Sequence, residues 1–232
     1  MTSEAFYKAL LIVTYAVCAP EYFPRAAYVA LMLSVDVFIV ADTFQYSRQS
    51  YQNRTRIRTP QGTQWLSIPL RGGQHGRPIG AVERDPRFPW QRKHQKALVY
   101  NYRSAPYFLH YDVSIADVLS RDERHLLPIL KRSLHCLVSA YRIETAIHYA
   151  SEWEGEPRTL LEVAKHFNGA TLVSLAGAFT HDAQQVKRIA RFDYSLKPHR
   201  QNFEGFEANL SALDTLLNHG PDARRLVLDG IR

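Results

Sequence analysis

The sequence predicts an α/β fold: a mostly parallel, Rossmann-like sheet flanked by helices, with an inserted basic β-hairpin lobe. Three observations support this. Apolar strand-like segments alternate with helical segments at both ends of the chain, the helical period disappears between residues 43 and 89, and positive charge is concentrated in that middle region. We therefore expect one α/β domain over residues 1–232, with residues 43–89 as the inserted lobe.

The first third of the chain has the pattern of a βαβ unit. Residues 10–17 are apolar and β-branched, which is typical of a buried parallel strand; an export or lipoprotein signal ending near Cys18 is the alternative for this short apolar run. Prolines at 20 and 24 predict a stiff turn, residues 25–32 a helix, and residues 36–41 a second buried strand that ends before Asp42.

The middle and last thirds continue the pattern. Residues 54–59 and 64–70 alternate with period two around the turn 60–62, which predicts a hairpin with Trp65 and Ile68 packed inward. Helices are expected at 90–102 and 121–141. Strands are then expected at 144–150, 170–175 and 191–196, and helices at 157–167, 182–189 and 207–218, the last ending at Gly220.

Composition excludes several classes of protein. Of 232 residues, 46% are hydrophobic and 22% charged, which excludes a disordered or collagenous chain. Cys18 and Cys136 are too few for a disulfide framework and lack metal-ligand spacing, so a reducing, cytoplasmic setting is expected. No membrane span is expected, because the longest apolar run is far shorter than a spanning helix. The sequence identifies no cofactor and no oligomeric state.

The positive charge is concentrated in one segment of the chain. The chain carries a formal net charge of +7, but residues 48–96 hold eleven Lys or Arg and two acids, a net +9 that leaves −2 for the rest. Alternation places Arg54, Arg56 and Arg58 on one strand face, which favours an anion site for a nucleotide, a coenzyme A pyrophosphate or an RNA backbone. The alternative is a solvated face that protects an edge strand. Because aromatic residues lie between the arginines, RNA remains one of the possible ligands.

Loops at the carboxyl ends of parallel strands are where such folds bind ligands. This rule selects residues 18–24, 42–45 and 174–177, and with them Cys18, Asp42, Gln45 and Ser174. Cys18 is either a buried small hydrophobe or a reactive thiol. His94 lies near a helix start beside cations, which would lower its pKa; it is either a neutral general base or a surface or capping histidine.

Several segments together resemble a known family, the WbqC-like family. The matching segments run in the family's order over almost the whole chain: PEYFP at 20–24, DVFIVADTFQY at 36–46, YQNRTRI at 51–57, WLSIP at 65–69, WQRKH at 90–94, APYF at 105–108 and NLSALDTLLN at 209–218. The resemblance implies a bacterial, cytoplasmic α/β protein. It also implies group transfer in the biosynthesis of O-antigen, other surface polysaccharides or specialised metabolites.

Two positions depart from the family pattern. The family's His-Gln-Pro after the first strand reads Cys18-Ala19-Pro20, and its Ser-Gly-x-Gly turn reads Ser174-Leu175-Ala176-Gly177. A His-Gln pair and a glycine-rich turn suit proton or phosphate chemistry, so their replacement predicts a different reaction or a retained anion site without the chemistry. The family-typical polar residues that remain are Asp42, Gln45, Asn53, Arg54, Arg56, His94 and Asp214.

The leading hypothesis is a biosynthetic transferase for a phosphorylated small-molecule donor. Arg54 and Arg56 would clamp the anion, Asp42 or His94 would act as the base, and Asn53 would orient a substrate atom. Gln45, Ser174 and Asp214 are further candidate binding residues. One competing hypothesis is an RNA-dependent protein that takes an aminoacyl group from a charged tRNA. The other is a non-catalytic subunit whose basic lobe docks on an acidic partner.

Overall fold

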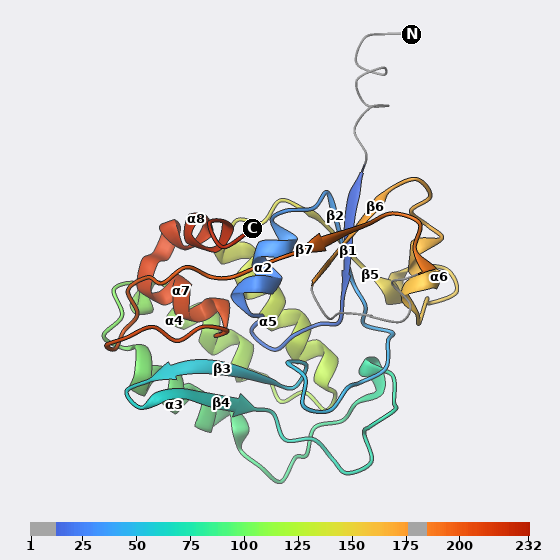
Figure 1. Ribbon diagram of the computed structural model, residues 1–232. Helices are drawn as coiled ribbons and strands as arrows, with labels where there is room; N and C mark the ends of the chain where they lie inside the picture. The colour runs from blue at the N-terminus through green and yellow to red at the C-terminus, as the bar shows by residue number, and fades with distance from the viewer. Residues whose placement is uncertain (1–12, 176–184) are drawn as a thin grey trace.

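A five-stranded parallel sheet forms the centre of the protein in a computed structural model that describes residues 13–175 and 185–232. The strands lie in the order β5-β2-β1-β6-β7, and each neighbouring pair is parallel. This confirms the predicted α/β class (Figure 1). The strand bounds are β1 Thr14–Cys18, β2 Val37–Val40, β5 Ala146–Tyr149, β6 Thr171–Leu175 and β7 Ile189–Phe192.

Helices cover both faces of this sheet. Figure 1 shows α2 and α5 on one face and α6 on the other. The α-helices are α2 Ala26–Met32, α3 Trp90–Tyr102, α4 Phe108–Ser120, α5 Leu126–Ala140, α6 Leu160–Ala164, α7 Ala212–His219 and α8 Ala223–Leu228. Short 3-10 helices are η1 Ile79–Ala81, η2 Ala150–Glu152 and η4 Gly220–Asp222.

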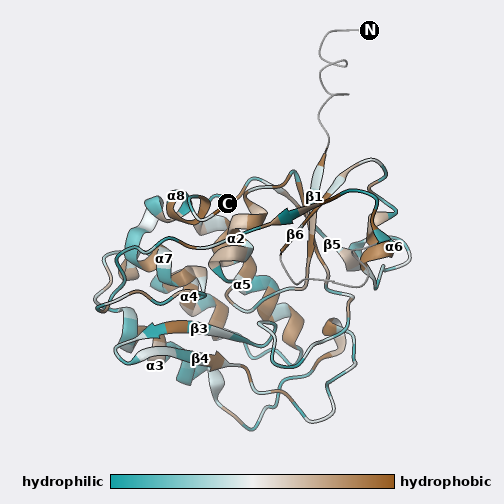
Figure 2. Ribbon diagram, in the orientation of Figure 1, coloured by the Kyte–Doolittle hydropathy of each residue, from teal (hydrophilic) through white to brown (hydrophobic). Residues whose placement is uncertain are grey.

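Side chains of β1 alternate between two hydrophobic clusters. Ala16 and Cys18 pack into the cluster that contains α2, α5 and α7, whereas Tyr15 and Val17 pack into a smaller cluster with α6. This alternation follows from the two-residue period of a strand, and it explains why the sequence of β1 is apolar at every position. Figure 2 shows hydrophobic residues in the inner strands around β1 and β6, whereas the arrow of the edge strand β7 is teal.

The basic middle segment forms the expected antiparallel hairpin, β3 Arg54–Thr59 and β4 Gly62–Ser67. Ile57, Leu66 and Ile68 are buried in the same cluster as α5, so the hairpin shares the main core. The expectation that Trp65 packs inward is wrong, because Trp65 is 40% exposed. It lies directly opposite Arg56 and therefore shares the outward face with the arginine, while Leu66 and Ile68 point the other way.

The turn after β1, residues 20–25, is fastened to three other elements. Phe23 is buried and has a positive φ of 40°. Its N–H donates to Ser133 Oγ of α5 at 3.2 Å, and its carbonyl accepts from Thr55 Oγ1 of β3 at 3.0 Å and from Ser211 Oγ at 2.9 Å. Ser211 also caps α7 by accepting from a backbone N–H. The turn thus joins the sheet, the hairpin, α5 and α7.

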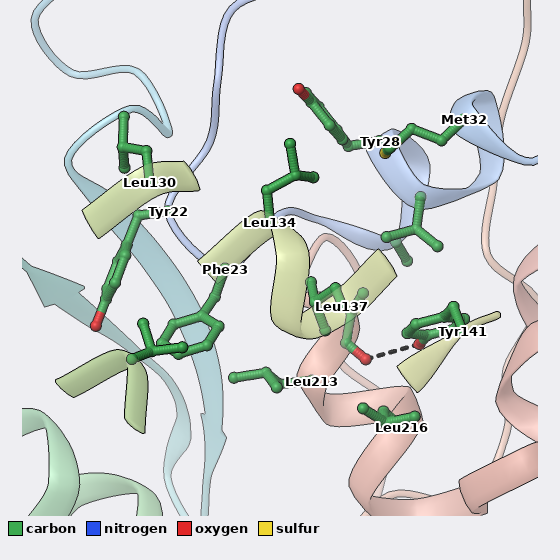
Figure 3. Close-up of a cluster of buried hydrophobic side chains, with 14 of the residues drawn as sticks. Tyr22, Phe23, Tyr28, Met32, Leu130, Leu134, Leu137, Tyr141, Leu213 and Leu216 are labelled. Atoms are coloured by element: carbon green, nitrogen blue, oxygen red, sulfur yellow. Dashed lines mark hydrogen bonds between the residues drawn. The ribbon is translucent and has the colours of Figure 1, made fainter. Parts of the chain in front are cut away.

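The core beside this turn is built from two amphipathic helices. Leu130, Leu134 and Leu137 recur at helical spacing on α5 and are buried. In Figure 3, Leu137 points toward Leu213 and Leu216 of α7, whereas Leu130 lies beside Tyr22. Tyr141 at the end of α5 donates its hydroxyl to the Ala212 carbonyl at 2.8 Å, so the ring stays buried with its polar atom satisfied.

Several element boundaries differ from the sequence expectations. Helices α4 and α8 were not predicted; α4 carries exposed leucine and valine as well as buried ones, so it shows no clear polar face. Helix α5 begins only at Leu126, because residues 124 and 125 pair with residues 83 and 84. Helix α7 begins only after Asn209, whose positive φ of 58° interrupts the helix.

Two expectations reach the residues that are not described. Residues 10–12 of the first predicted strand lie outside the described part, and β1 begins at Thr14. The predicted helix 182–189 lies largely outside it, and Ile189 belongs to β7. Among the helices of the described residues, none has the length and apolar character needed to cross a membrane.

The Phe23 turn yields a stability prediction. Thr55→Val and Ser211→Ala each remove one of the two hydroxyl donors to the Phe23 carbonyl. Thr55→Val is expected to lower the free energy of unfolding by about 1 kcal/mol, and Ser211→Ala by about 2 kcal/mol because it also removes the N-cap of α7. The double variant leaves this buried carbonyl without either donor, so its loss should exceed the sum of the single losses by about 1 kcal/mol. Urea unfolding of the wild type, the two single variants and the double variant measures this excess loss.

Thr171→Val is the matched control, because this β6 threonine has no side-chain hydrogen bond to the described residues. It should leave the free energy of unfolding within about 0.5 kcal/mol of the wild-type value. Strict additivity of Thr55→Val and Ser211→Ala would contradict the shared role of the two hydroxyls.

Candidate functional site

The carboxyl ends of the strands meet at one edge of the sheet, because every pair is parallel. Strands β2 and β5 lie on one side of β1, and β6 and β7 lie on the other, so the order reverses between β1 and β6. Ligands of open α/β sheets bind beyond the carboxyl ends of the strands, often at such a switch point. The polar residues described next lie at the same edge, at the ends of β2 and β5 on one side of this point. Ser174 lies in β6, with its hydroxyl 3.4 Å from the Leu175 carbonyl oxygen; the rest of the expected turn, residues 176 and 177, lies outside the described residues.

Asp42 follows β2 at this edge and is only 1% exposed. One carboxylate oxygen accepts the Ser151 backbone N–H at 2.9 Å, and the other accepts the Ser151 hydroxyl at 2.7 Å. The ammonium group of Lys131, from α5, lies 3.0 Å from the second oxygen. A buried carboxylate is tolerated only when it is paired and hydrogen-bonded, and both conditions are met here.

Lys131 connects Asp42 to an aromatic ring. Its Nζ lies 3.9 Å from the centroid of the Tyr149 ring at the end of β5, a cation–π contact, and its side chain keeps 31% exposure. Burial, with the nearby Asp42 charge and then Glu152, raises the pKa of Tyr149 to about 12. The Tyr149 hydroxyl lies 3.0 Å from His135 Nε2. The strand-end site therefore contains a carboxylate, an accessible ammonium, a phenol and an imidazole.

Cys18 lies at the carboxyl end of β1, as expected, but is 7% exposed. Burial raises its pKa well above the usual range of a thiol, and the Glu21 carboxylate raises it further, while Arg25 acts in the opposite direction. The thiol is therefore protonated at neutral pH and lacks the electropositive surroundings of a reactive cysteine. Tyr28 is buried nearby, and its hydroxyl has no hydrogen-bond partner among the described residues.

His94 lies inside the protein, between the turn after β1 and the hairpin. Its Nε2 must donate to the Ser67 carbonyl at 3.2 Å, so Nδ1 of the neutral ring accepts from the Tyr22 hydroxyl at 2.9 Å. Burial, rather than the neighbouring cations, lowers its pKa to about 4. Both nitrogens are occupied by structural hydrogen bonds, which is the arrangement of a satisfied internal histidine.

The three alternating arginines of β3 have different surroundings. Arg58 is buried and donates to the carbonyl groups of Thr59, Gly62 and Glu204. Arg54 lies over the Trp65 ring at 4.2 Å, and Arg56 lies 5.7 Å from the same ring. Arg54 donates to the Ser50 and Gln49 carbonyl groups and Arg56 to the Thr63 hydroxyl, but neither has an ion-pair partner among the described residues. The outward face of the hairpin therefore keeps two positive charges beside an exposed indole.

The sequence matches a family model over nearly its whole length. The WbqC-like protein family matches residues 19–226. The chain belongs to the WbqC-like family. It is also similar to the uncharacterized protein Rv1507c of Mycobacterium tuberculosis (strain ATCC 25618 / H37Rv), with 28% identity over 220 residues that cover 90% of this chain and 94% of the relative. No solved structure matches it significantly.

Three further residues expected at the site of this WbqC-like protein lie elsewhere or are already bonded. Asn53 accepts from Tyr46 OH and donates to the Ile68 carbonyl, each at 3.0 Å, which joins the two strands of the hairpin. Gln45 is exposed, and its backbone forms an isolated antiparallel β-bridge with that of Pro78. Asp214 lies in α7, 1% exposed, and accepts from two residues, Tyr102 and Gln201, both at 2.9 Å.

Asp214 thus forms part of a buried network rather than an anion site. Burial raises its pKa to about 6, against the opposing effects of its two hydrogen bonds and of Arg58. A carboxylate in this position links α7 to α3 and the hairpin, because the Tyr102 hydroxyl also accepts the Arg58 N–H.

Much of the basic charge in the WbqC-like hairpin region is structural. Arg71 pairs with Glu83, Arg87 with Asp85, and the buried Arg84 with Asp122, in addition to the carbonyl contacts of Arg58. No group of three His, Cys, Asp or Glu side chains among the described residues could hold a metal ion. The available cations on the hairpin are therefore fewer than the net charge of the segment suggested.

Sequence reasoning found Asp42 but missed Lys131, His135, Tyr149 and Ser151. Ser151 follows a predicted strand, so the strand-end rule that selected Asp42 could have selected it. Lys131 and His135 are four residues apart and share one face of a predicted helix, but only the packing of α5 brings that face to the end of β5.

The buried His94 predicts a pH-dependent stability. The unfolded chain protonates this histidine near pH 6.5, whereas the folded protein keeps it neutral down to about pH 4. Stability contributed by the neutral ring is therefore present above pH 6.5 and is lost as the pH falls toward 4. The wild type should lose about 3 kcal/mol relative to His94→Gln between pH 7 and pH 4, measured by urea unfolding.

Wild type and His94→Gln both contain Asp214, whose raised pKa gives the opposite dependence of stability on pH. The difference between their free energies of unfolding therefore cancels the Asp214 contribution. His110→Gln, at an exposed position of α4, is the matched control. A stability difference between wild type and His94→Gln that does not change with pH would show that His94 is accessible to protons in the folded state.

Proposed function

We propose that this WbqC-like protein is a biosynthetic group-transfer enzyme that binds a phosphorylated donor at the carboxyl edge of the parallel sheet. One observation carries the proposal. A partly exposed cation, Lys131, is held by the buried carboxylate of Asp42 where the strand ends converge. A fixed positive charge at this edge is what a donor with a phosphate leaving group requires.

Lys131 and Asp42 have complementary roles in this proposal. The ammonium stabilises negative charge that develops on the leaving oxygen of the donor, and Asp42 with Ser151 keeps it in position before the donor binds. When a donor phosphate draws Lys131 toward it, the Asp42 oxygen that the ammonium had covered becomes accessible and receives the proton of the acceptor group. The acceptor then attacks the donor carbon or acyl group, and the phosphate-bearing group leaves with the bonding electron pair.

The hairpin supplies the second part of the proposed donor site. Arg54 and Arg56 have no acidic partners among the described residues and lie beside Trp65, so they suit the anionic and planar parts of a nucleotide-type donor. No proton transfer is assigned to His94 or Cys18, because the imidazole nitrogens of His94 are both bonded and the Cys18 thiol is buried.

Donor binding tests this proposal. Native mass spectrometry of freshly purified protein, followed by calorimetry with nucleotide sugars, nucleotides and coenzyme A esters, should identify a phosphorylated ligand. Asp42→Asn/Lys131→Met removes both charges without leaving an unpaired buried carboxylate, and it should weaken that ligand about tenfold or more. Arg54→Ala/Arg56→Ala should have a similar effect.

Lys197→Met is the matched control, because this lysine is exposed and has no ion pair with the described residues. It should bind the ligand as the wild type does. If the Asp42/Lys131 variant folds with wild-type circular dichroism and binds the same ligand with unchanged affinity, the strand-end site is not the donor site.

A second candidate function, binding of RNA, is favoured by a row of rings and guanidinium groups. Arg25 lies 4.0 Å from the Tyr51 ring centroid, Tyr51 lies 5.3 Å from Trp65, and Arg54 covers the Trp65 ring at 4.2 Å. Exposed aromatic rings between cations are typical of surfaces that bind single-stranded nucleic acid. A tRNA that donates an aminoacyl group would use this surface.

Gel-shift titrations with bulk tRNA at increasing salt test the RNA candidate. Binding should fall steeply with salt, and Trp65→Ala should weaken it about tenfold. Phe88→Ala removes an aromatic ring of similar exposure that has no ring–ring contact with this row and is the control. Weak binding that does not depend on salt would exclude this candidate.

A further inference from the structure

Two neighbouring helices, α3 and α4, expose large hydrophobic residues on one outer face. Leu109 and Val113 of α4 are 80% and 78% exposed, and Val99 and Tyr100 of α3 are 42% and 72% exposed. The helices contact each other, and a groove of about 170 Å³ between them is lined by Val99, Val113 and their neighbours. A contiguous apolar face of this kind, rather than scattered single residues, indicates a surface that is covered by a partner.

Charge on this face is divided between the helices. Helix α3 contains Arg92, Lys93 and Lys96 and no acidic residue, whereas α4 contains Asp112 and Asp117 and no lysine or arginine. None of these five side chains has an ion-pair partner among the described residues. The face therefore has an unpaired basic side and an unpaired acidic side around its apolar centre.

Helical spacing determines where these charges lie. Arg92 and Lys96 precede Val99 by seven and three residues, and Asp117 follows Val113 by four, so the row of α3 that carries Val99 is basic and the row of α4 that carries Val113 is acidic. A face with this arrangement is complementary to itself: a two-fold rotation places α3 of one copy against α4 of the other.

We propose that this face is the interface of a two-fold symmetric homodimer, in which α3 of each protomer packs against α4 of its partner. Val99, Leu109 and Val113 form the apolar centre, and the basic residues of α3 meet the acidic residues of α4 across it. The partner is a second copy because the same surface supplies both halves of the charge pattern. This inference does not depend on the proposed function.

The size of the face predicts its strength. Helices of 13 residues are about 20 Å long and pack about 10 Å apart, so each protomer contributes roughly 400 Å², which is the area of a weak, transient interface. We therefore expect a monomer–dimer equilibrium with a dissociation constant on the order of micromolar.

Sedimentation equilibrium from about 1 to about 200 µM full-length protein tests the interface, over a range set by that expected constant. Val113→Asp places a charge in the apolar centre and should weaken dimerisation about tenfold or more. The substituted side chain is exposed, so folding should be unaffected, as circular dichroism can verify. Ile231→Asp, at a less exposed apolar position near the C-terminus, is the matched control and should dimerise as the wild type does.

Charge reversal distinguishes a second copy from other partners. Arg92→Glu/Lys96→Glu makes both helices acidic, and Asp112→Lys/Asp117→Lys makes both basic, so each variant alone should be monomeric. A mixture of the two variants should form a heterodimer, because every facing pair is again complementary. A wild-type protein that stays monomeric over the whole range, or dimers that Val113→Asp leaves unchanged, would overturn the proposal and leave the face to a different partner.

Discussion

The backbone of Phe23 is the constraint on which the arrangement of the other elements depends. Phe23 has a positive φ and is buried in the core, so its backbone N–H and carbonyl groups need hydrogen-bond partners from elsewhere in the protein. Hydroxyl groups from α5, from β3 and from the cap of α7 supply them. The hairpin cannot leave the sheet, and α7 cannot rotate, without exposing these buried groups. The neighbouring Tyr22 adds α3 to the same junction through His94.

A second buried polar group organises the candidate site. Asp42 cannot remain charged in the interior unless donors surround it, and Ser151 and Lys131 are those donors. Lys131 remains partly exposed while the side chain of its partner Asp42 is hidden. The polar groups of β2, β5 and α5 thereby converge at the edge where an open parallel sheet binds its ligand.

The basic middle of the chain has several separate uses. Arg58 and Arg84 are buried and bind carbonyl or carboxylate groups, so they stabilise the fold. Arg54 and Arg56 remain available on the hairpin beside Trp65. Arg92, Lys93 and Lys96 of α3 have no ion-pair partner among the described residues. Net charge alone treats these groups as one surface, whereas their contacts distinguish arginines that stabilise the fold from cations that have no ion-pair partner among the described residues.

The sequence by itself determined the parallel α/β sheet, the hairpin, the stiff turn after β1 and the position of Asp42, because hydrophobic period, proline and strand-end rules are local. It could not determine that His94 and Asp214 lie inside hydrogen-bond networks, that Trp65 faces outward, or that Lys131 meets Asp42. Those facts depend on residues far apart in the chain. Only the packing of α5 against the sheet brings Lys131 to Asp42 at the carboxyl edge. The sequence shows which side chains are present, but a site also depends on which of them lie next to one another in space.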